Sequence, residues 1–408
     1  MPLHDDRSGS LVPGVTERRL QVAAVGVALM GALPAFMTGA LAVQIGRDIE
    51  LGPTRLGVAT GAFFGAAAMT SALMGRLAER VGPGRAMRSA AIASAVLQLS
   101  LALSPAYSAL LAALLVAGPA NSLAQVGANL LLAKAIRPER QGWALAVKQA
   151  GMPGATLLGG LAVPALAVTV GWRWAFAAGA LGALAAAAIV PVGAVAAGGR
   201  RPAGRRVDVP LGPLVLLAAA VGFASAANGT LATFVVSAGV DSGLGESAAG
   251  LVLTLGSAAG ITMRLVVGAR ADRRGGRHLP VVSLLLAGGA AGYLLLAPGT
   301  VPTHLVGSLV AFGFGWAWPG LFNLAVVRLN PTAPAAATGI TQTGVYVGAL
   351  TGPILFGAVV DAAGYGLAWL LAGLASGAAA VGVSVGRRRV VAWRDAAAAP
   401  GAAAGAQG

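Results

Sequence analysis

The chain has no cysteine and few charged side chains, and each absence excludes a class of protein. Without cysteine, structural disulfides, thiolate metal sites and cysteine nucleophiles are excluded. Charged residues make up 10% of the chain, whereas soluble domains carry about 25%. Hydrophobic residues make up 57%, and the mean hydropathy is +0.80. The chain lacks the charges needed to cover a water-facing surface, so we predict an integral membrane protein.

Histidine and acidic side chains are expected to be absent from the apolar segments. We expect His4, His278 and His304 to lie outside the membrane spans, which would exclude a histidine metal cluster there. Asp and Glu are likewise expected only at helix ends and in loops. Because the spans then hold no Ser/His, His/Glu or paired-Asp constellation, we predict no metal, no cofactor and no enzymatic activity.

Apolar blocks alternate along the chain with charged or Pro/Gly-rich stretches. Each block has about 20 residues, the length that spans a bilayer as a helix. The pattern predicts an all-α protein with twelve transmembrane helices. They are expected near residues 20–44, 55–75, 86–104, 107–132, 142–166, 174–196, 211–237, 246–268, 279–298, 302–328, 335–360 and 366–386.

The net charge of +15 could suggest a nucleic-acid partner, but the placement of the basic residues argues against one. Nearly all of the 28 Lys and Arg fall in alternate loops and at the termini, and the opposite loops hold only Arg47, Arg55 and Arg173. This is the positive-inside bias. It predicts a multi-pass protein of the cell (inner) membrane with both termini cytoplasmic: a tail over 1–19, a basic linker over 197–210, and a disordered tail over 387–408.

An internal repeat divides the chain into two copies. The segment Gly75-Arg76-Leu77-Ala78-Glu79-Arg80-Val81-Gly82 returns 193 positions later as Gly268-Ala269-Arg270-Ala271-Asp272-Arg273-Arg274-Gly275. The same offset pairs Gly57 with Gly250, Pro138 with Pro331, Gln149 with Gln342, Gly151 with Gly344 and Gly171 with Gly364. Repeats of this length predict two pseudo-symmetric six-helix bundles, over 20–196 and 211–386, as in secondary transporters.

The repeated segment resembles the G-x-L-a-D-r-x-G-r-r signature of the major facilitator superfamily. The first copy departs from it at Glu79, where Asp is usual, and at Pro83-Gly84, where two basic residues are usual. Residues 313–361 also resemble helices 10 and 11 of that family. The resemblance implies rocker-switch alternating access and a latch between helix ends; the alternative is that the arginines only enforce topology. The implied latch residues are Gly75, Glu79, Arg80, Gly82, Arg85, Gly268, Asp272, Arg273, Gly275 and Arg277.

In this family helices 1, 4, 7 and 10 line the substrate cavity, so polar residues on those helices are candidate substrate contacts. Asn121 and Gln125 lie four residues apart on helix 4, Asn228 lies on helix 7, and Trp316 and Asn323 share a face of helix 10. For each single residue, an interhelical hydrogen bond is the alternative.

Lys148 is the most distinctive single candidate for substrate binding, because its charged side chain lies inside the fifth predicted span. Insertion of a lysine into a span costs about 2.5–3.5 kcal/mol at the centre, and snorkelling toward the cytoplasm is the alternative. Gln149 and Gln342 follow at equivalent depth in the two copies. Arg264 is expected to snorkel or to join the loop charges; if it and Lys148 point inward, they form a site for an anion.

We therefore predict a transporter, expected to be monomeric, that moves a small organic or inorganic anion through the lipid bilayer. A proton-linked exporter of lipophilic compounds is the second possibility, since Gly151-Met152-Pro153-Gly154 loosely resembles the exporter signature of helix 5. The carboxylate typical of such exporters is missing. A non-transporting membrane sensor on the same fold is the third. Coupling could use an exchanged anion, a protonatable substrate or Lys148 itself.

Overall fold

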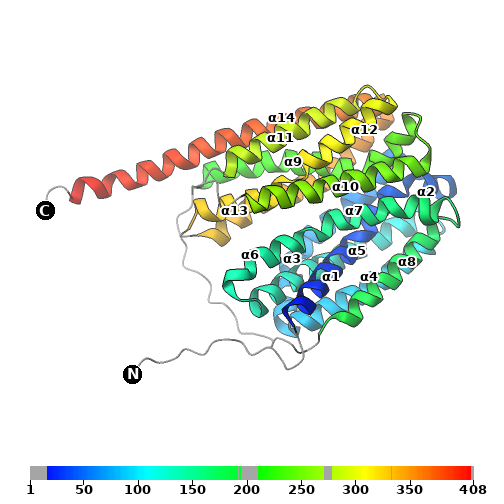
Figure 1. Ribbon diagram of the computed structural model, residues 1–408, viewed down its shortest axis with the longest axis horizontal. Helices are drawn as coiled ribbons and strands as arrows, with labels where there is room; N and C mark the ends of the chain where they lie inside the picture. The colour runs from blue at the N-terminus through cyan, green and yellow to red at the C-terminus, as the bar shows by residue number, and fades with distance from the viewer. Residues whose placement is uncertain (1–15, 192, 194–209, 271–277, 332, 406–408) are drawn as a thin grey trace. The chain divides into compact units, whose positions relative to one another are not determined.

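The computed structural model describes residues 16–191, 193, 210–270, 278–331 and 333–405. Within these ranges every regular element is a helix (Figure 1). The elements are α1 (Glu17–Ala40), α2 (Ala42–Ile49), α3 (Pro53–Val81), α4 (Pro83–Ala102), α5 (Tyr107–Ala135), α6 (Pro138–Gln149), α7 (Gly151–Ala162), η1 (Val163–Ala167), α8 (Trp172–Ile189), α9 (Leu211–Asp241), α10 (Glu246–Ala269), α11 (His278–Leu296), α12 (Val301–Val310), η3 (Ala311–Gly315), α13 (Trp318–Leu329) and α14 (Pro334–Gly405).

The prediction of an all-α membrane protein is confirmed. By length and composition, 10 helical segments of the described residues could cross a membrane. One of them runs through Gly364, where φ of 80° and ψ of 173° divide α14 into two helices. The helix α4, with 20 residues, carries Arg85 and Arg88 near its start and falls outside the ten. Dividing α14 and adding α4 gives the twelve helices predicted.

Proline marks where several helices begin. Pro53, Pro83, Pro138 and Pro334 are the first residues of α3, α4, α6 and α14. A proline at the first helical position loses no hydrogen bond, because the N–H there has no partner within the helix. The start of each of these four helices therefore coincides with a proline in the sequence.

The internal repeat is visible in the backbone. Gly171 and Gly364, at equivalent positions, both have positive φ, 106° and 80°. Glu50 and Gly243 are also equivalent, and their φ values are 49° and 100°. Positive φ is uncommon outside glycine. Two such matches at one offset therefore show that the copies share their turns as well as their sequence pattern.

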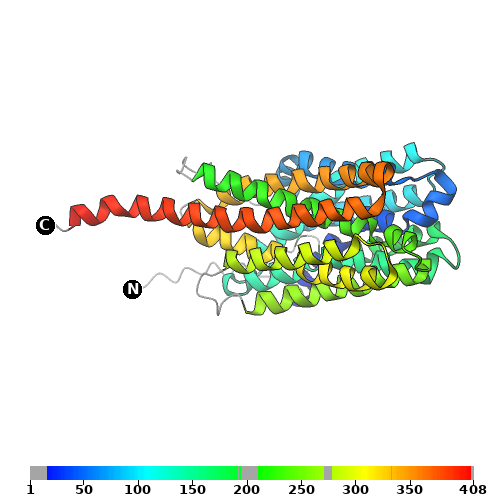
Figure 2. The same cartoon turned by 90° about the horizontal axis from the view of Figure 1, so that it is seen from above.

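The C-terminal segment is helical as far as Gly405, whereas the sequence predicts a disordered tail over 387–408. The helix α14 continues to Gly405 and does not end near residue 386 (Figure 2). The residues after Arg394 are mostly alanine. Low sequence complexity suggests disorder, but alanine has the highest helix propensity of all residues and so favours continuation of the helix.

The residues group into two compact units. Unit 1 comprises 1–34, 66–155 and 173–201. Its core is built from small side chains of α1, α4, α5 and α8, with Leu131 and Leu132 among the fully buried residues. Small side chains let helices approach closely in lipid, where packing replaces the hydrophobic effect as the driving force.

Unit 2 comprises 35–65, 156–172 and 202–408. Its core includes Trp318 and Phe322 of α13 and side chains of α9, α11 and α14. The helix α14 packs along α9 so closely that a β-carbon on Gly344 or Gly348 would overlap the carbonyl oxygen of Ala218 or Gly222. The division into bundles over 20–196 and 211–386 stays a prediction. The linker 197–209 lies outside the described residues.

Candidate functional site

Lys148 lies at the end of α6 in unit 1 and is 3% exposed. Its Nζ atom donates a 2.5 Å hydrogen bond to Oε1 of Gln125 on α5. The amide nitrogen of Gln125 in turn donates to Oδ1 of Asn121 at 3.3 Å and to the carbonyl oxygen of Ala28 on α1 at 3.0 Å. We call Lys148, Gln125 and Asn121 the lysine cluster. It brings together three of the predicted site residues.

A break between two helices positions the lysine cluster. The helix α6 ends at Gln149, and α7 begins at Gly151. A β-carbon on Gly151 would lie 3.4 Å from the backbone of Val25 and of Leu29, so the missing side chain lets α7 start close against α1. This approach holds the end of α6, and with it Lys148, beside α1 and α5.

The charge of Lys148 has a neutral partner. Within the described residues, Lys148 makes no ion pair, and the Gln125 amide oxygen is its hydrogen-bond acceptor. A buried charge is usually paired, because its transfer out of water is costly. The lysine cluster therefore presents an uncompensated positive charge, which is the electrostatic requirement for binding an anion.

The remaining predicted substrate contacts divide between the units. Gln149, partly buried, is in unit 1, and Gln342, also partly buried, is in unit 2. Asn228 of α9 accepts a long hydrogen bond, 3.4 Å, from the Tyr293 hydroxyl, and Asn323 of α13 is partly buried. That these residues share one cavity with the lysine cluster stays a prediction.

Trp316 belongs to an aromatic cluster of unit 2. Its ring centroid lies 5.4 Å from that of Phe312 and 6.0 Å from that of Phe36, which lies 5.8 Å from Phe64. The Trp316 carbonyl oxygen accepts a 2.6 Å hydrogen bond from the Arg264 guanidinium. Arg264 of α10 is thus hydrogen-bonded to the backbone between η3 and α13. Sequence reasoning missed Phe36 and Phe64, since single aromatic residues in apolar helices carry no distinguishing pattern.

The predicted latch is only partly within the described residues. Gly82 has φ of 87° and precedes α4, and Glu79, Arg80 and Arg85 are exposed. A β-carbon on Gly268 would meet open space, and one on Gly75 would lie 3.9 Å from a Val126 methyl group. Asp272, Arg273, Gly275 and Arg277 lie outside the described residues, so the latch stays a prediction.

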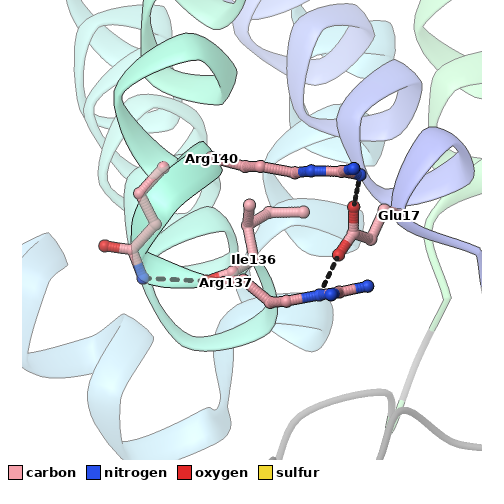
Figure 3. Close-up of polar contacts among 5 residues, drawn as sticks. Glu17, Ile136, Arg137 and Arg140 are labelled. Carbon is pink, nitrogen blue, oxygen red and sulfur yellow. Dashed lines mark hydrogen bonds and ion pairs between the residues drawn. The ribbon is translucent and has the colours of Figure 1, made fainter.

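A different ion-pair group is present in unit 1. Glu17, in the first turn of α1, lies 3.6 Å from the Arg137 guanidinium and 3.2 Å from that of Arg140 (Figure 3). The Gln141 amide donates to the carbonyl oxygen of Ile136, which follows α5, and to that of Ala133 in the last turn of α5. These contacts tie the start of α1 to the start of α6, the helix that carries Lys148.

Unit 2 carries polar contacts at its predicted outer end, the end that holds α2 and the turn after α9. Glu246 accepts hydrogen bonds from Gln44, at 2.8 Å, and from Arg47. Asp361 of α14 accepts from the backbone N–H of Thr54 at 3.0 Å. Both carboxylates join segments from the first copy to helices of the second.

Close helix contacts in unit 2 follow the repeat. A β-carbon on Gly57 of α3 would overlap the Pro353 carbonyl oxygen of α14. A β-carbon on Gly250 of α10 would lie 2.8 Å from the Gly160 carbonyl oxygen of α7. The offset of 193 relates Gly57 to Gly250 and also relates Gly160 to Pro353. The α3–α14 and α7–α10 contacts are therefore equivalent.

The expectation that the histidines lie outside the spans is wrong for two of them. His304 is 1% exposed inside α12, within a segment long and apolar enough to cross a membrane. His278 is the first residue of α11, also 1% exposed, and its Nε2 lies 2.9 Å from the Arg328 guanidinium. His278 precedes the predicted span 279–298 by one residue, whereas His304 lies inside the predicted span 302–328, so the expectation for His304 disagreed with those bounds. His4 lies outside the described residues.

Comparisons with known proteins agree with this architecture, a helical multi-pass membrane protein built from two repeated halves. The family model of the Major Facilitator Superfamily matches residues 23–349 and 217–404. The structure is similar to the crystal structure of a bacterial homolog of the human lysosomal transporter Spinster, in an inward-facing and unoccupied conformation. That similarity has a TM-score of 0.68 and 15% sequence identity, and it covers 92% of this chain and 97% of the other. No curated protein matches the sequence.

The chain belongs to the Major Facilitator Superfamily. It is a transmembrane transporter for a small-molecule substrate, embedded in a lipid bilayer.

Proposed function

We propose that the chain transports a small organic or inorganic anion, and that Lys148 contacts the anion. The supporting observation is the 2.5 Å hydrogen bond from Lys148 to the neutral Gln125 amide. A charged partner would already neutralise the lysine, whereas an amide leaves its charge available. An anion that reaches Lys148 would gain a charge-assisted hydrogen bond, about twice as strong as one between neutral groups.

We further propose that transport proceeds by rocker-switch alternating access in the cell (inner) membrane, with both termini cytoplasmic and the protein monomeric. The glycine contacts of Gly57 and Gly250, together with the polar contacts of Glu246 and Asp361, join first-copy and second-copy segments at the predicted outer end. Such contacts suit a state whose outer side is closed. Transport would require them to separate and re-form in each cycle.

The aromatic cluster favours a second candidate, a proton-linked exporter of lipophilic compounds. Phe36, Phe64, Phe312 and Trp316 come from helices of both copies and offer ring faces to an apolar substrate. A lipophilic cation would be repelled by Lys148, so the two candidates differ in the sign of charge that they select.

A ligand-stabilisation screen on purified protein separates the candidates. Organic and inorganic anions are compared with lipophilic cations for wild type, Lys148→Ala and Lys134→Ala, in which the chain's only other lysine, exposed on α5, is removed. A ligand at a hundred times its Kd stabilises the folded state by about 2.7 kcal/mol. We expect an anion to stabilise wild type and Lys134→Ala but not Lys148→Ala. Stabilisation by lipophilic cations, unchanged in Lys148→Ala, would favour the exporter.

A further inference from the structure

His304 is a buried histidine that the proposed anion site does not use. It is the fourth residue of α12, near the predicted outer end of unit 2. Its ring is hydrogen-bonded to the backbone of Val235 on α9. A β-carbon on Gly239, one turn further along α9, would lie 3.0 Å from the Nε2 atom. Gly239 therefore provides the space that the imidazole ring occupies.

The Nε2 atom of His304 is buried without a hydrogen-bond partner among the described residues. The same holds for Oγ of Ser308, one turn later on the same face of α12. Most buried polar atoms in proteins are hydrogen-bonded, so two orphan atoms on one helix face call for an explanation. Because the other ring nitrogen makes the contact with Val235, Nε2 of the neutral ring carries a lone pair that can accept a proton.

No charged side chain in the described residues neutralises His304. The titratable groups on the helices packed against α12 are Asp241 on α9, Glu246 and Arg264 on α10, and His278 and Tyr293 on α11. None of these groups makes a hydrogen bond or an ion pair with His304. A proton on Nε2 would thus create a buried charge with no acceptor, which the present arrangement of α9 and α12 disfavours.

The helix α9, which confines His304, also contacts the first copy. A β-carbon on Gly39 of α1 would lie 2.9 Å from the backbone of Thr233, which is two residues before Val235 on α9. An opening movement that separates α1 from α9 at this contact and shifts α9 relative to α12 would let water reach the imidazole. A proton that binds better to the hydrated ring must shift the population toward the open arrangement, because ligands shift equilibria only by their differential affinity.

We propose that His304 is a protonation site that links acid pH to opening of the predicted outer end. Opening exposes Nε2 to water and stabilises the protonated ring; closure returns the ring, neutral, to the space beside Gly239. This linkage goes beyond the choice of substrate. It supplies a proton-coupled step that does not need a carboxylate inside the spans.

The absence of native cysteine makes a direct test possible. Leu56 is 2% exposed and lines a cavity of about 290 Å³ between α2, α3, α9 and α14. Leu56→Cys therefore reports opening by its rate of maleimide labelling in nanodiscs. Gly52→Cys, in open space, corrects for the intrinsic pH dependence of the thiol. We expect the corrected rate to rise at least about fivefold as the pH falls from about 8 to about 5.5, a typical allosteric coupling.

The matched variants are His304→Gln, which should abolish the pH response, and His278→Gln, which should retain it. Gly239→Ala crowds the ring and should raise labelling at every pH, so it tests the geometry even if His304→Gln fails to fold. A pH response unchanged in His304→Gln, or absent from wild type, would overturn the proposal. The assay contains no substrate, so its outcome is independent of whether the cargo is an anion.

Discussion

Glu50 and Gly243, equivalent residues of the two copies, both adopt positive φ, at 49° and 100°. A non-glycine residue in the left-handed region is strained by about 1–2 kcal/mol, because its β-carbon approaches the following carbonyl oxygen. The exposed ion pair of Glu50 with Arg55, at 3.5 Å, offsets little of this. We therefore predict that Glu50→Gly raises the free energy of unfolding by about 1 kcal/mol, measured by thermal or denaturant unfolding in detergent.

Gly243→Ala is the control for this prediction. The nearest atom to an added β-carbon there is a Val301 methyl at 3.9 Å, so the substitution has room and only the φ of 100° opposes it. The alanine should lower the stability by about the amount that Glu50→Gly raises it. Equal stabilities for all three proteins would contradict the assignment of strain.

Gln125 is the neutral hydrogen-bond partner of Lys148. Gln125→Glu tests whether this neutrality leaves the Lys148 charge available to bind an anion. The change replaces an amide by a carboxylate of nearly the same shape, which would form an ion pair with Lys148 across the present 2.5 Å contact. We expect anion binding to weaken at least about tenfold while the protein stays folded, as measured by titration calorimetry and thermal unfolding. Gln125→Met, which removes the acceptor without adding charge, should weaken anion binding less. The reverse order would contradict the electrostatic role.

The architecture was accessible from the sequence because it depends on long, regular patterns. Apolar blocks, alternating basic loops and the 193-residue repeat each extend over many residues, so local errors do not change the result. The depth and helical spacing of polar residues made Lys148, Gln125 and Asn121 separate candidates, and the hydrogen bonds between them are seen in the structure. Such residues are rare in an apolar chain and therefore conspicuous.

The failures have a local origin. Helix starts depend on single residues and on turns of a few residues, so α11 begins at His278, one residue before the predicted span. The persistence of α14 to Gly405 reflects alanine propensity, which outweighed low complexity. The partners of Tyr293 and Arg264 depend on packing between distant helices, and a single sequence does not contain that information.

Gly57→Ala should disturb the closed contact at the predicted outer end. The added methyl would overlap the Pro353 carbonyl oxygen, so α3 and α14 must separate. Overpacking of this kind costs about 1–3 kcal/mol. We expect faster labelling of a cysteine at Leu51, which is 8% exposed and lines the same cavity. Gly52→Ala, which meets no atom within 4 Å, should leave the rate unchanged. Unchanged labelling in both variants would show that this contact does not limit opening.

The equivalent α7–α10 contact differs from the α3–α14 contact in one polar pair. The hydroxyl groups of Thr156 and Ser257 form a 2.7 Å hydrogen bond, and both residues are fully buried. The offset of 193 relates them to Ala349 and Phe64, which cannot make such a bond. The α7–α10 contact therefore has a buried hydrogen bond between two hydroxyl groups that the equivalent positions of the α3–α14 contact lack.

A double-mutant cycle with Thr156→Val and Ser257→Ala isolates this bond, because each variant alone removes the pair and leaves the helices in place. We expect a coupling of about 0.6 kcal/mol, and at most about 1.7 kcal/mol, as measured for hydrogen bonds between membrane helices. The readout is unfolding in detergent, with Thr262→Val, an exposed threonine of α10, as the control. Since the bond joins first-copy and second-copy helices, its loss should also raise Leu56→Cys labelling. Additive effects of the two variants would show that the hydroxyl groups contribute no shared interaction.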